Sequence, residues 1–244
     1  MNLFDLIFLV ILLLVVIDSI NKGLLNSCFA FLSSIIGLFA AIKYNSVLAE
    51  WVDAKFSLLQ HFELFITENF VMPAQISQTN IGTLSLPDIG AYMDKINFSV
   101  ELKVQLLKYI LNLSEEFMLN ATTTLGEVTN SFMTEIAMKT VIFVVLWFII
   151  YKVAFFLSHF LIDAIQISLG DTMNKVGGLG IGICHSLFIS MVIFGMIYPF
   201  LELIGFTEPS FYMAVANTVH DAGLVRFLTM LNSIIMGELL VPWL

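Results

Sequence analysis

Four long runs of apolar residues constrain the fold of this chain more than any other feature. An α-helix rises about 1.5 Å per residue, so about 20 apolar residues cross a hydrocarbon core of about 30 Å. The chain is 59% hydrophobic and only 12% charged, whereas soluble proteins are about a quarter charged. We therefore predict an integral membrane protein. The runs are Leu3 to Ile20, Leu24 to Ile42, Thr140 to Leu161 and Val176 to Ile204.

The order of these runs along the chain predicts its architecture. Short polar turns join the first run to the second and the third to the fourth, so each pair is expected to form a hairpin of two helices. We therefore expect an all-α membrane protein with four transmembrane helices, a helical insert between the hairpins and an amphipathic helix at the C-terminus. The predicted parts are the first hairpin (1–42), the insert (43–139), the second hairpin (140–204) and the tail (205–244).

The insert and the tail carry helical patterns of their own. In the stretches Asp53–Phe70 and Glu101–Leu119, apolar side chains recur every three or four residues, and a segment containing Pro and Gly joins the two stretches. In the tail, Arg226 and Asn232 lie on a polar stripe opposite apolar residues. This pattern favours a helix that lies on the membrane surface. A fifth span over residues 223–240 is the alternative.

Lysines in the two short turns predict the orientation. Lys22 lies in the first turn and Lys175 in the second, whereas the long central segment is rich in acidic residues. Basic residues in short loops favour the cytoplasm, so both turns are predicted to be cytoplasmic, and both termini and residues 43–139 extracytoplasmic. The turns also share the pattern D-[ST]-x-N-K, at Asp18–Lys22 and Asp171–Lys175, which favours a duplicated hairpin.

The sequence disfavours several classes of function. The glycines between Gly177 and Gly182 do not have the G-x-G-x-x-G spacing of a nucleotide site. The net charge of −9 and the single arginine argue against binding to nucleic acid. We find no motif for a catalytic nucleophile and its base, and no set of metal ligands at a typical spacing. We therefore expect no enzyme activity, no catalytic residues, no cofactor and no metal.

Small residues recur every four positions in two of the runs. Such ladders place small side chains on one helical face and let two helices approach closely in lipid. They are therefore interpreted as helix-packing faces, and the sequence leaves open whether they meet within one chain or between chains. The ladder residues are Ser33, Gly37 and Ala41 in the second run, and Gly178, Gly182, Ser186 and Ser190 in the fourth.

Ionisable residues inside or near the runs suggest an alternative role. Charged groups in a membrane are costly and often functional, so Asp5, Asp18, His159 and Asp163 are candidates for a polar or proton path. His159 and Asp163 lie four residues apart and can share a helical face. The simpler interpretation is that these groups lie near the headgroups, where their cost is small.

Motifs in both hairpins carry a resemblance to a known family. The chain begins M-N-x-x-D, ending at Asp5, and an apolar helix then leads to a basic residue and a glycine, Lys22 and Gly23. In the second hairpin, Asp171 precedes a G-x-x-x-G pattern that begins at Gly178. Over roughly residues 1–44 and 140–200, this pattern resembles the colicin V production protein (CvpA) family. Asp18 departs from it, because the family usually has a small residue there, and the central segment is longer than the family's linker.

The resemblance implies a multi-pass protein of the bacterial inner membrane with no established reaction. It links the chain to the production or export of a peptide toxin and to envelope fitness. We therefore expect a non-enzymatic scaffold or an oligomeric pore. Its expected partners are the lipid bilayer and either a second copy of the chain or another envelope or export protein. The alternative is a small proton-coupled transporter that uses the ionisable residues named above.

Overall fold

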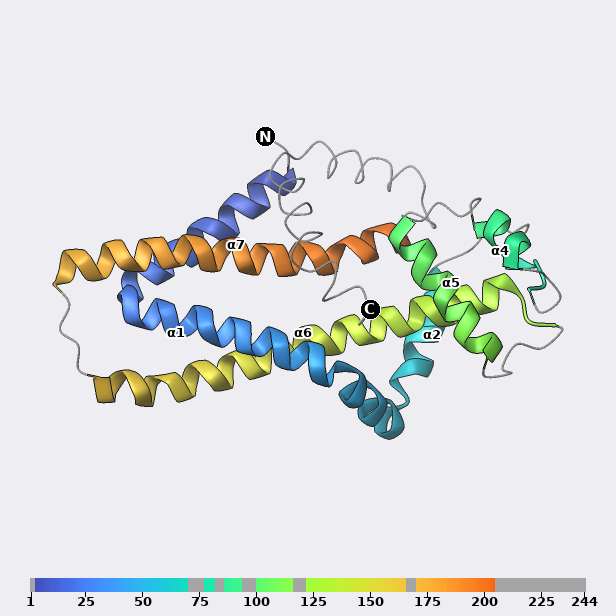
Figure 1. The fold of residues 1–244 in the computed structure, drawn as a ribbon, viewed down its shortest axis with the longest axis horizontal. Coiled ribbons are helices and arrows are strands. Elements are labelled where there is room, and N and C mark those ends of the chain that lie inside the picture. The colour runs from blue at the N-terminus through green and yellow to red at the C-terminus, as the bar shows by residue number, and fades with distance from the viewer. Residues whose placement is uncertain are drawn as a thin grey trace. The chain divides into compact units, whose positions relative to one another are not determined.

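The computed structural model describes residues 3–69, 77–81, 86–93, 100–115, 122–165 and 170–204. Within these ranges the chain forms helices and no strand, apart from one isolated antiparallel bridge between Asn80 and Thr124. The predicted all-α fold is therefore confirmed. The tail, residues 205–244, and the fifth span considered within it lie outside the described residues. The helices are α1 (Leu3–Phe56), α2 (Leu58–Asn69), α4 (Leu86–Met93), α5 (Val100–Glu115), α6 (Leu125–Ile165) and α7 (Asp171–Ile204) (Figure 1).

Three of these helices are long and apolar enough to cross a membrane. The qualifying segments are Asp5–Phe56 in α1, Leu125–Phe160 in α6 and Asp171–Ile193 in α7. Helix α1 is not continuous, because Gly23 has non-helical backbone angles. Figure 1 shows the chain reversing direction between the two parts of α1. We call residues 3–22 the first arm of α1 and residues 24–56 the second arm.

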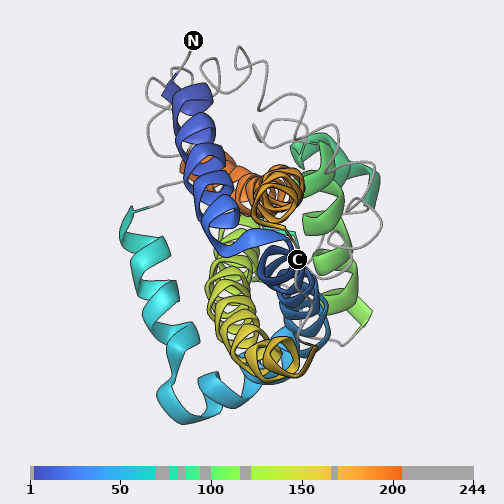
Figure 2. The same ribbon diagram turned by 90° about the vertical axis from the view of Figure 1, so that its left-hand side faces the viewer.

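The chain divides into two compact units. The first, here called the hairpin unit, contains α1 as far as Trp51, α6 from Lys139 and α7 as far as Ile197. Figure 2 looks at this unit from the end at which α1 reverses direction. Its buried apolar core draws on both arms of α1 and on the two other long helices. The core residues are Phe8, Leu38, Ala41, Ile42, Phe143, Met191 and Val192.

The second unit, here called the insert unit, contains α2, α4, α5 and the start of α6. Among the residues described, its core consists of Ile66, Ile81, Ile89, Met93, Leu102, Leu106, Ile110, Leu125, Val128, Phe132, Met133 and Ile136. The described segments of this unit are therefore helices that pack around a core of their own. The predicted boundaries at residues 43 and 139 fall inside α1 and α6, so no break in the backbone marks them.

Local chemistry explains where the helices of the insert unit begin and end. Thr124 and Glu127 cap the start of α6 reciprocally: the Glu127 N–H donates to Thr124 Oγ1 (3.2 Å), and the Thr124 N–H donates to Glu127 Oε2 (3.0 Å). The predicted helix over 53–70 is interrupted at Ser57, whose φ is 51°. Beyond this break, Asp53 Oδ1 accepts a hydrogen bond from the N–H of Leu59 at 2.7 Å and so caps α2.

Candidate functional site

A hydrogen bond links the turn of α1 to the start of α7. Gly23 has φ 78° and ψ 177°, a conformation that L side chains rarely adopt. A Cβ at this position would also collide with the side chain of Asn174 on α7. The N–H of Leu24, the first residue of the second arm, donates to Asn174 Oδ1 at 2.8 Å. A side chain at the start of α7 therefore caps the second arm of α1.

The small-residue ladder of α7 packs against the first arm of α1. A Cβ added to Gly178 would lie 2.5 Å from the carbonyl oxygen of Ser19, and one added to Gly182 would lie 2.7 Å from Ser19 Cβ. Ser186 and Ser190, farther along the ladder, are fully buried. These distances leave no room for a larger side chain at either glycine. Gly178 and Gly182 of the α7 ladder therefore lie directly against the first arm of α1.

The ladder of the second arm packs against α6. A Cβ added to Gly37 would lie 3.0 Å from the carbonyl oxygen of Trp147 and 3.1 Å from the backbone nitrogen of Tyr151. Ser33 and Ala41, on the same ladder, are buried. The indole Nε1–H of Trp147 donates to a backbone carbonyl oxygen of the second arm, that of Ser34, at 3.0 Å. This bond fixes the large side chain beside the glycine.

Both copies of the D-[ST]-x-N-K pattern form an ion pair between their first and last residues. Lys22 pairs with Asp18, and Lys175 Nζ lies 2.9 Å from Asp171 Oδ2. The first copy ends the first arm of α1, whereas the second copy forms the first turn of α7. The two copies therefore occupy opposite helix ends. Each pair is exposed and adds at most about 0.5 kcal/mol to stability.

The structure describes three of the four side chains of the candidate polar path, those of Asp5, Asp18 and His159. Asp5 and Asp18 lie on the same arm, 13 residues apart, which corresponds to about 20 Å along a helix. His159 is exposed and packs edge-on against Phe155, with ring centroids 5.1 Å apart. The side chain of Asp163 lies outside the described residues. A role in proton movement for these four residues stays a prediction.

His185 on α7 is a more enclosed polar group than any of the three path residues whose side chains are described. It is 4% exposed, and its Nε2 has no hydrogen-bond partner within the described part of the chain. Its ring lies 5.7 Å from that of Phe31 on the second arm and 6.4 Å from that of Tyr151 on α6. An imidazole in this setting can exchange a proton or bind a small polar group.

The sequence alone did not predict the burial of His185. One signal was available, because His185 is adjacent to the ladder of Gly182 and Ser186 and follows Gly178 by seven residues, two helical turns. The sequence also did not predict that Ser19, near the end of the first arm, and Gly23, at the turn, lie opposite Gly178.

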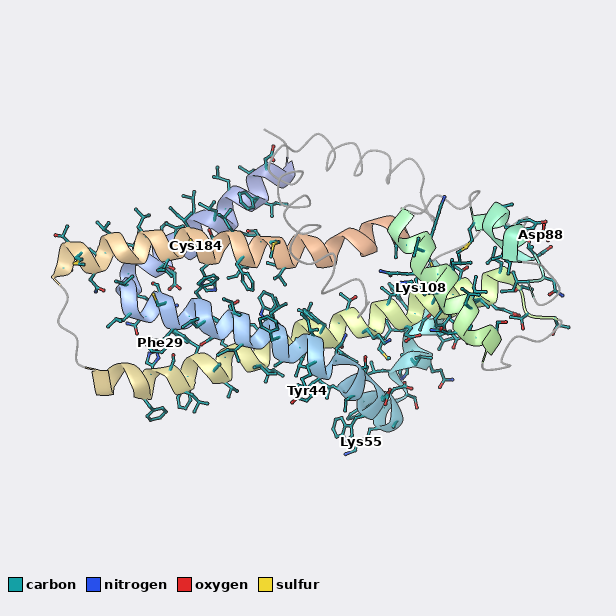
Figure 3. All side chains as sticks on the ribbon, in the orientation of Figure 1. Phe29, Tyr44, Lys55, Asp88, Lys108 and Cys184 are labelled. Atoms are coloured by element: carbon teal, nitrogen blue, oxygen red, sulfur yellow. The ribbon has the colours of Figure 1, made fainter. Side chains whose placement is uncertain are left out.

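The described residues contain no cluster of three or more His, Cys, Asp or Glu side chains that could hold a metal ion. Cys28 and Cys184 are both free thiols. Cys184 lies exposed on α7 (Figure 3) and Cys28 is half-buried on the second arm. The chemistry at the centre of the hairpin unit is therefore that of closely packed small residues around one buried imidazole.

The comparison with known families agrees with the resemblance seen in the sequence. No curated protein and no solved structure matches the chain. The sequence model of the family described as Colicin V production protein matches residues 4–75, which include both arms of α1 and its turn at Gly23. The match thus confirms the predicted resemblance to the CvpA family over residues 4–75. Residues 140–200, which also carry the resemblance, lie outside the matched range.

Proposed function

We propose that this chain is a CvpA-type protein of the bacterial inner membrane and acts as a non-enzymatic scaffold. In this role it supports the production or export of a toxin of the colicin V type and the maintenance of the envelope. The observation that carries the proposal is the family match over residues 4–75, which falls on the apolar helix α1. The role of an oligomeric pore is the variant to be tested against it.

The packing of the ladders favours a scaffold over a homo-oligomeric pore. Gly37 approaches α6 and Gly182 approaches the first arm within the same chain. The faces that most easily bring transmembrane helices together are thus already used inside the hairpin unit. A ring of copies would need another surface.

The proposed topology has four spans, with both short turns in the cytoplasm. The turn of α1 at Gly23 divides this long helix into two arms. The first arm contains the apolar run Leu3 to Ile20, and the second arm contains the run Leu24 to Ile42. The hydrogen bond from Leu24 to Asn174 supports placing both turns on one side of the membrane. The extracytoplasmic position of the insert follows from this arrangement together with the lysines of the turns.

The mass of the complex extracted with its native membrane distinguishes the two variants. For the scaffold we expect one copy of the chain together with a second, different membrane protein. Liposomes that contain the purified chain should then be no more permeable to protons or ions than empty liposomes. A ring of identical subunits that conducts ions would exclude the scaffold and support the pore.

A proton-coupled transporter is the second candidate, because the buried Nε2 of His185 lacks a partner among the described residues. Transport predicts pH-gradient-driven flux in liposomes that is lost when His185 is replaced by Gln. Replacement of the exposed His159 by Ala gives a matched control. Flux that is lost in His159→Ala and kept in His185→Gln would instead support the path predicted from the sequence, which includes His159.

A further inference from the structure

Lys152 places a positive charge in the middle of an exposed apolar face. It lies on α6 within the predicted span from Thr140 to Leu161. It is exposed, as are the large apolar side chains around it, among them Phe148 (57%), Val153 (53%) and Phe156 (65%). A purely apolar face of this kind needs only lipid to cover it. A lysine on the same face is costly in lipid and requires a partner.

The depth of Lys152 places it beyond the easy reach of the headgroups. It lies nine residues before Leu161 and 12 residues after Thr140, or about 14 Å and about 18 Å along the helix axis. An extended lysine side chain spans about 6 Å, so its ammonium group falls well short of either end of the span.

The direction of the side chain makes the nearer end less accessible still. Lys152 Nζ lies 5.2 Å from the ring centroid of Phe148 and 5.5 Å from that of Tyr151. Both rings precede it in the helix, so the side chain points back toward the centre of the span, as helical side chains usually do. The aromatic rings solvate the cation only in part.

Neither the described part of this chain nor a second copy offers a matching carboxylate. Within the described residues Lys152 forms no ion pair. The acidic residues of the four predicted spans, Asp5, Asp18 and Glu202, all lie within three residues of a span end. A parallel second copy would therefore present its carboxylates at the wrong depth.

The spacing of the exposed residues fits a neighbouring helix. Val145, Ile149, Lys152, Phe156 and His159 are all exposed and follow one another at intervals of four, three, four and three residues. This alternation keeps one seam of α6 facing a single partner helix.

We propose that this seam of α6 docks a transmembrane helix of a different membrane protein, which carries an aspartate or glutamate near the middle of the bilayer. The partner's carboxylate neutralises Lys152, and the apolar residues of the seam supply the packing. The inference rests on the proposed scaffold role, because it describes the partner that the scaffold holds.

Photo-crosslinking in intact membranes tests this seam directly. A photoreactive amino acid replaces Phe156, and the adduct is followed in three backgrounds: the native Lys152, Lys152→Met and Lys152→Arg. We expect an adduct with one other membrane protein that falls about tenfold in Lys152→Met and is retained in Lys152→Arg. Lys43→Met is the matched control, because Lys43 also lies over an aromatic ring, that of Tyr44, but follows the end of its span. This control should leave the adduct unchanged.

The partner's own residue completes the test. Replacing its mid-span carboxylate by an amide should remove the adduct, and the exchanged pair, Lys152→Asp with Lys in the partner, should restore it. An adduct of unchanged yield in Lys152→Met would overturn the proposal. So would adducts formed only with lipid, with a second copy or with residues 205–244 of the same chain. If a second protein co-purifies stably but its binding does not depend on Lys152, the scaffold role is supported and only the proposed role of this seam is contradicted.

Discussion

At the scale of single residues, Gly182 and Gly180 lie on the same helix but in opposite environments. A Cβ at Gly182 would lie 3.2 Å from Val16 Cα and 2.7 Å from Ser19 Cβ, whereas a Cβ at Gly180 would meet nothing within 4 Å. We expect Gly182→Ala to lower the free energy of unfolding by about 1–3 kcal/mol, because α7 and the first arm must separate. Thermal unfolding in detergent measures the loss.

Gly180→Ala is the control for that comparison. It adds the same methyl group to the same helix without a contact, and it should be neutral or stabilising by up to about 1 kcal/mol, because alanine favours the helix. Equal effects of the two substitutions would contradict the close approach of α7 to α1.

Tyr109 in α5 makes the stability of the insert unit depend on alkaline pH. Burial, with the negative charge of Glu135 as the smaller cause, raises the pKa of Tyr109 from 10 to about 12. The folded state thus favours the neutral phenol. Its contribution is complete below pH 10, where the unfolded chain also holds the proton, and is lost as the pH rises toward 12.

We expect the free energy of unfolding to fall by up to about 2 kcal/mol over this interval relative to a Tyr109→Phe variant. Denaturant unfolding at pH 9, 10 and 11 in both proteins provides the measurement. Parallel pH profiles for the two proteins would contradict the shifted pKa.

At the scale of elements, α7 supplies a cap to the second arm of α1. Asn174→Ala removes the acceptor for the N–H of Leu24 and should destabilise the hairpin unit by about 1–2 kcal/mol. The duplicated pattern offers a control, because Asn21 holds the equivalent position in the first copy and is exposed. Asn21→Ala should change the unfolding free energy by less than about 0.5 kcal/mol. Equal losses of unfolding free energy in the two variants would contradict a stabilising role that is specific to the Asn174 cap.

The elements also show how far sequence reasoning reaches. Runs such as Leu24–Ile42 predicted membrane helices because lipid leaves the backbone few alternatives. The continuation of α1 beyond Ile42 through residues 43–52 was not predicted, because this stretch is more polar than the apolar runs. Likewise, the ladder of Gly178 predicted close packing, but not that Ser19 lies opposite, because local patterns do not specify their partners.

At the scale of the whole molecule, function depends on which surfaces stay exposed, and can bind a partner, after the chain has folded. Glycines of the two predicted ladders approach helices of the same chain, whereas the predicted polar path lies on α1 and α6 and stays a prediction. The burial of His185 on α7 depends on side chains of two other helices, α1 and α6, and could not be predicted from its own helix. The exposed Lys152 suggests a docking site only because the side chains around it on the surface of α6 are also exposed and apolar.

The topology of the whole chain leads to a last prediction, which single cysteines can test. In a background with Cys28→Ala and Cys184→Ala, we would place one cysteine at the exposed Asn21, Met173 or Lys108. Positions 21 and 173 should resist a membrane-impermeant maleimide in spheroplasts and react after permeabilisation, because both turns are predicted to be cytoplasmic. Position 108, in the insert unit (Figure 3), should react without permeabilisation.

Two results would contradict different parts of this topology. Different accessibility of positions 21 and 173 would contradict the hydrogen bond between Leu24 and Asn174, because that bond requires both turns on one side of the membrane. The reverse labelling pattern, with both turns reactive and the insert protected, would keep this bond and invert the orientation. The orientation predicted from the lysines of the turns would then be wrong. The insert would face the cytoplasm, where a scaffold would bind a different set of partners.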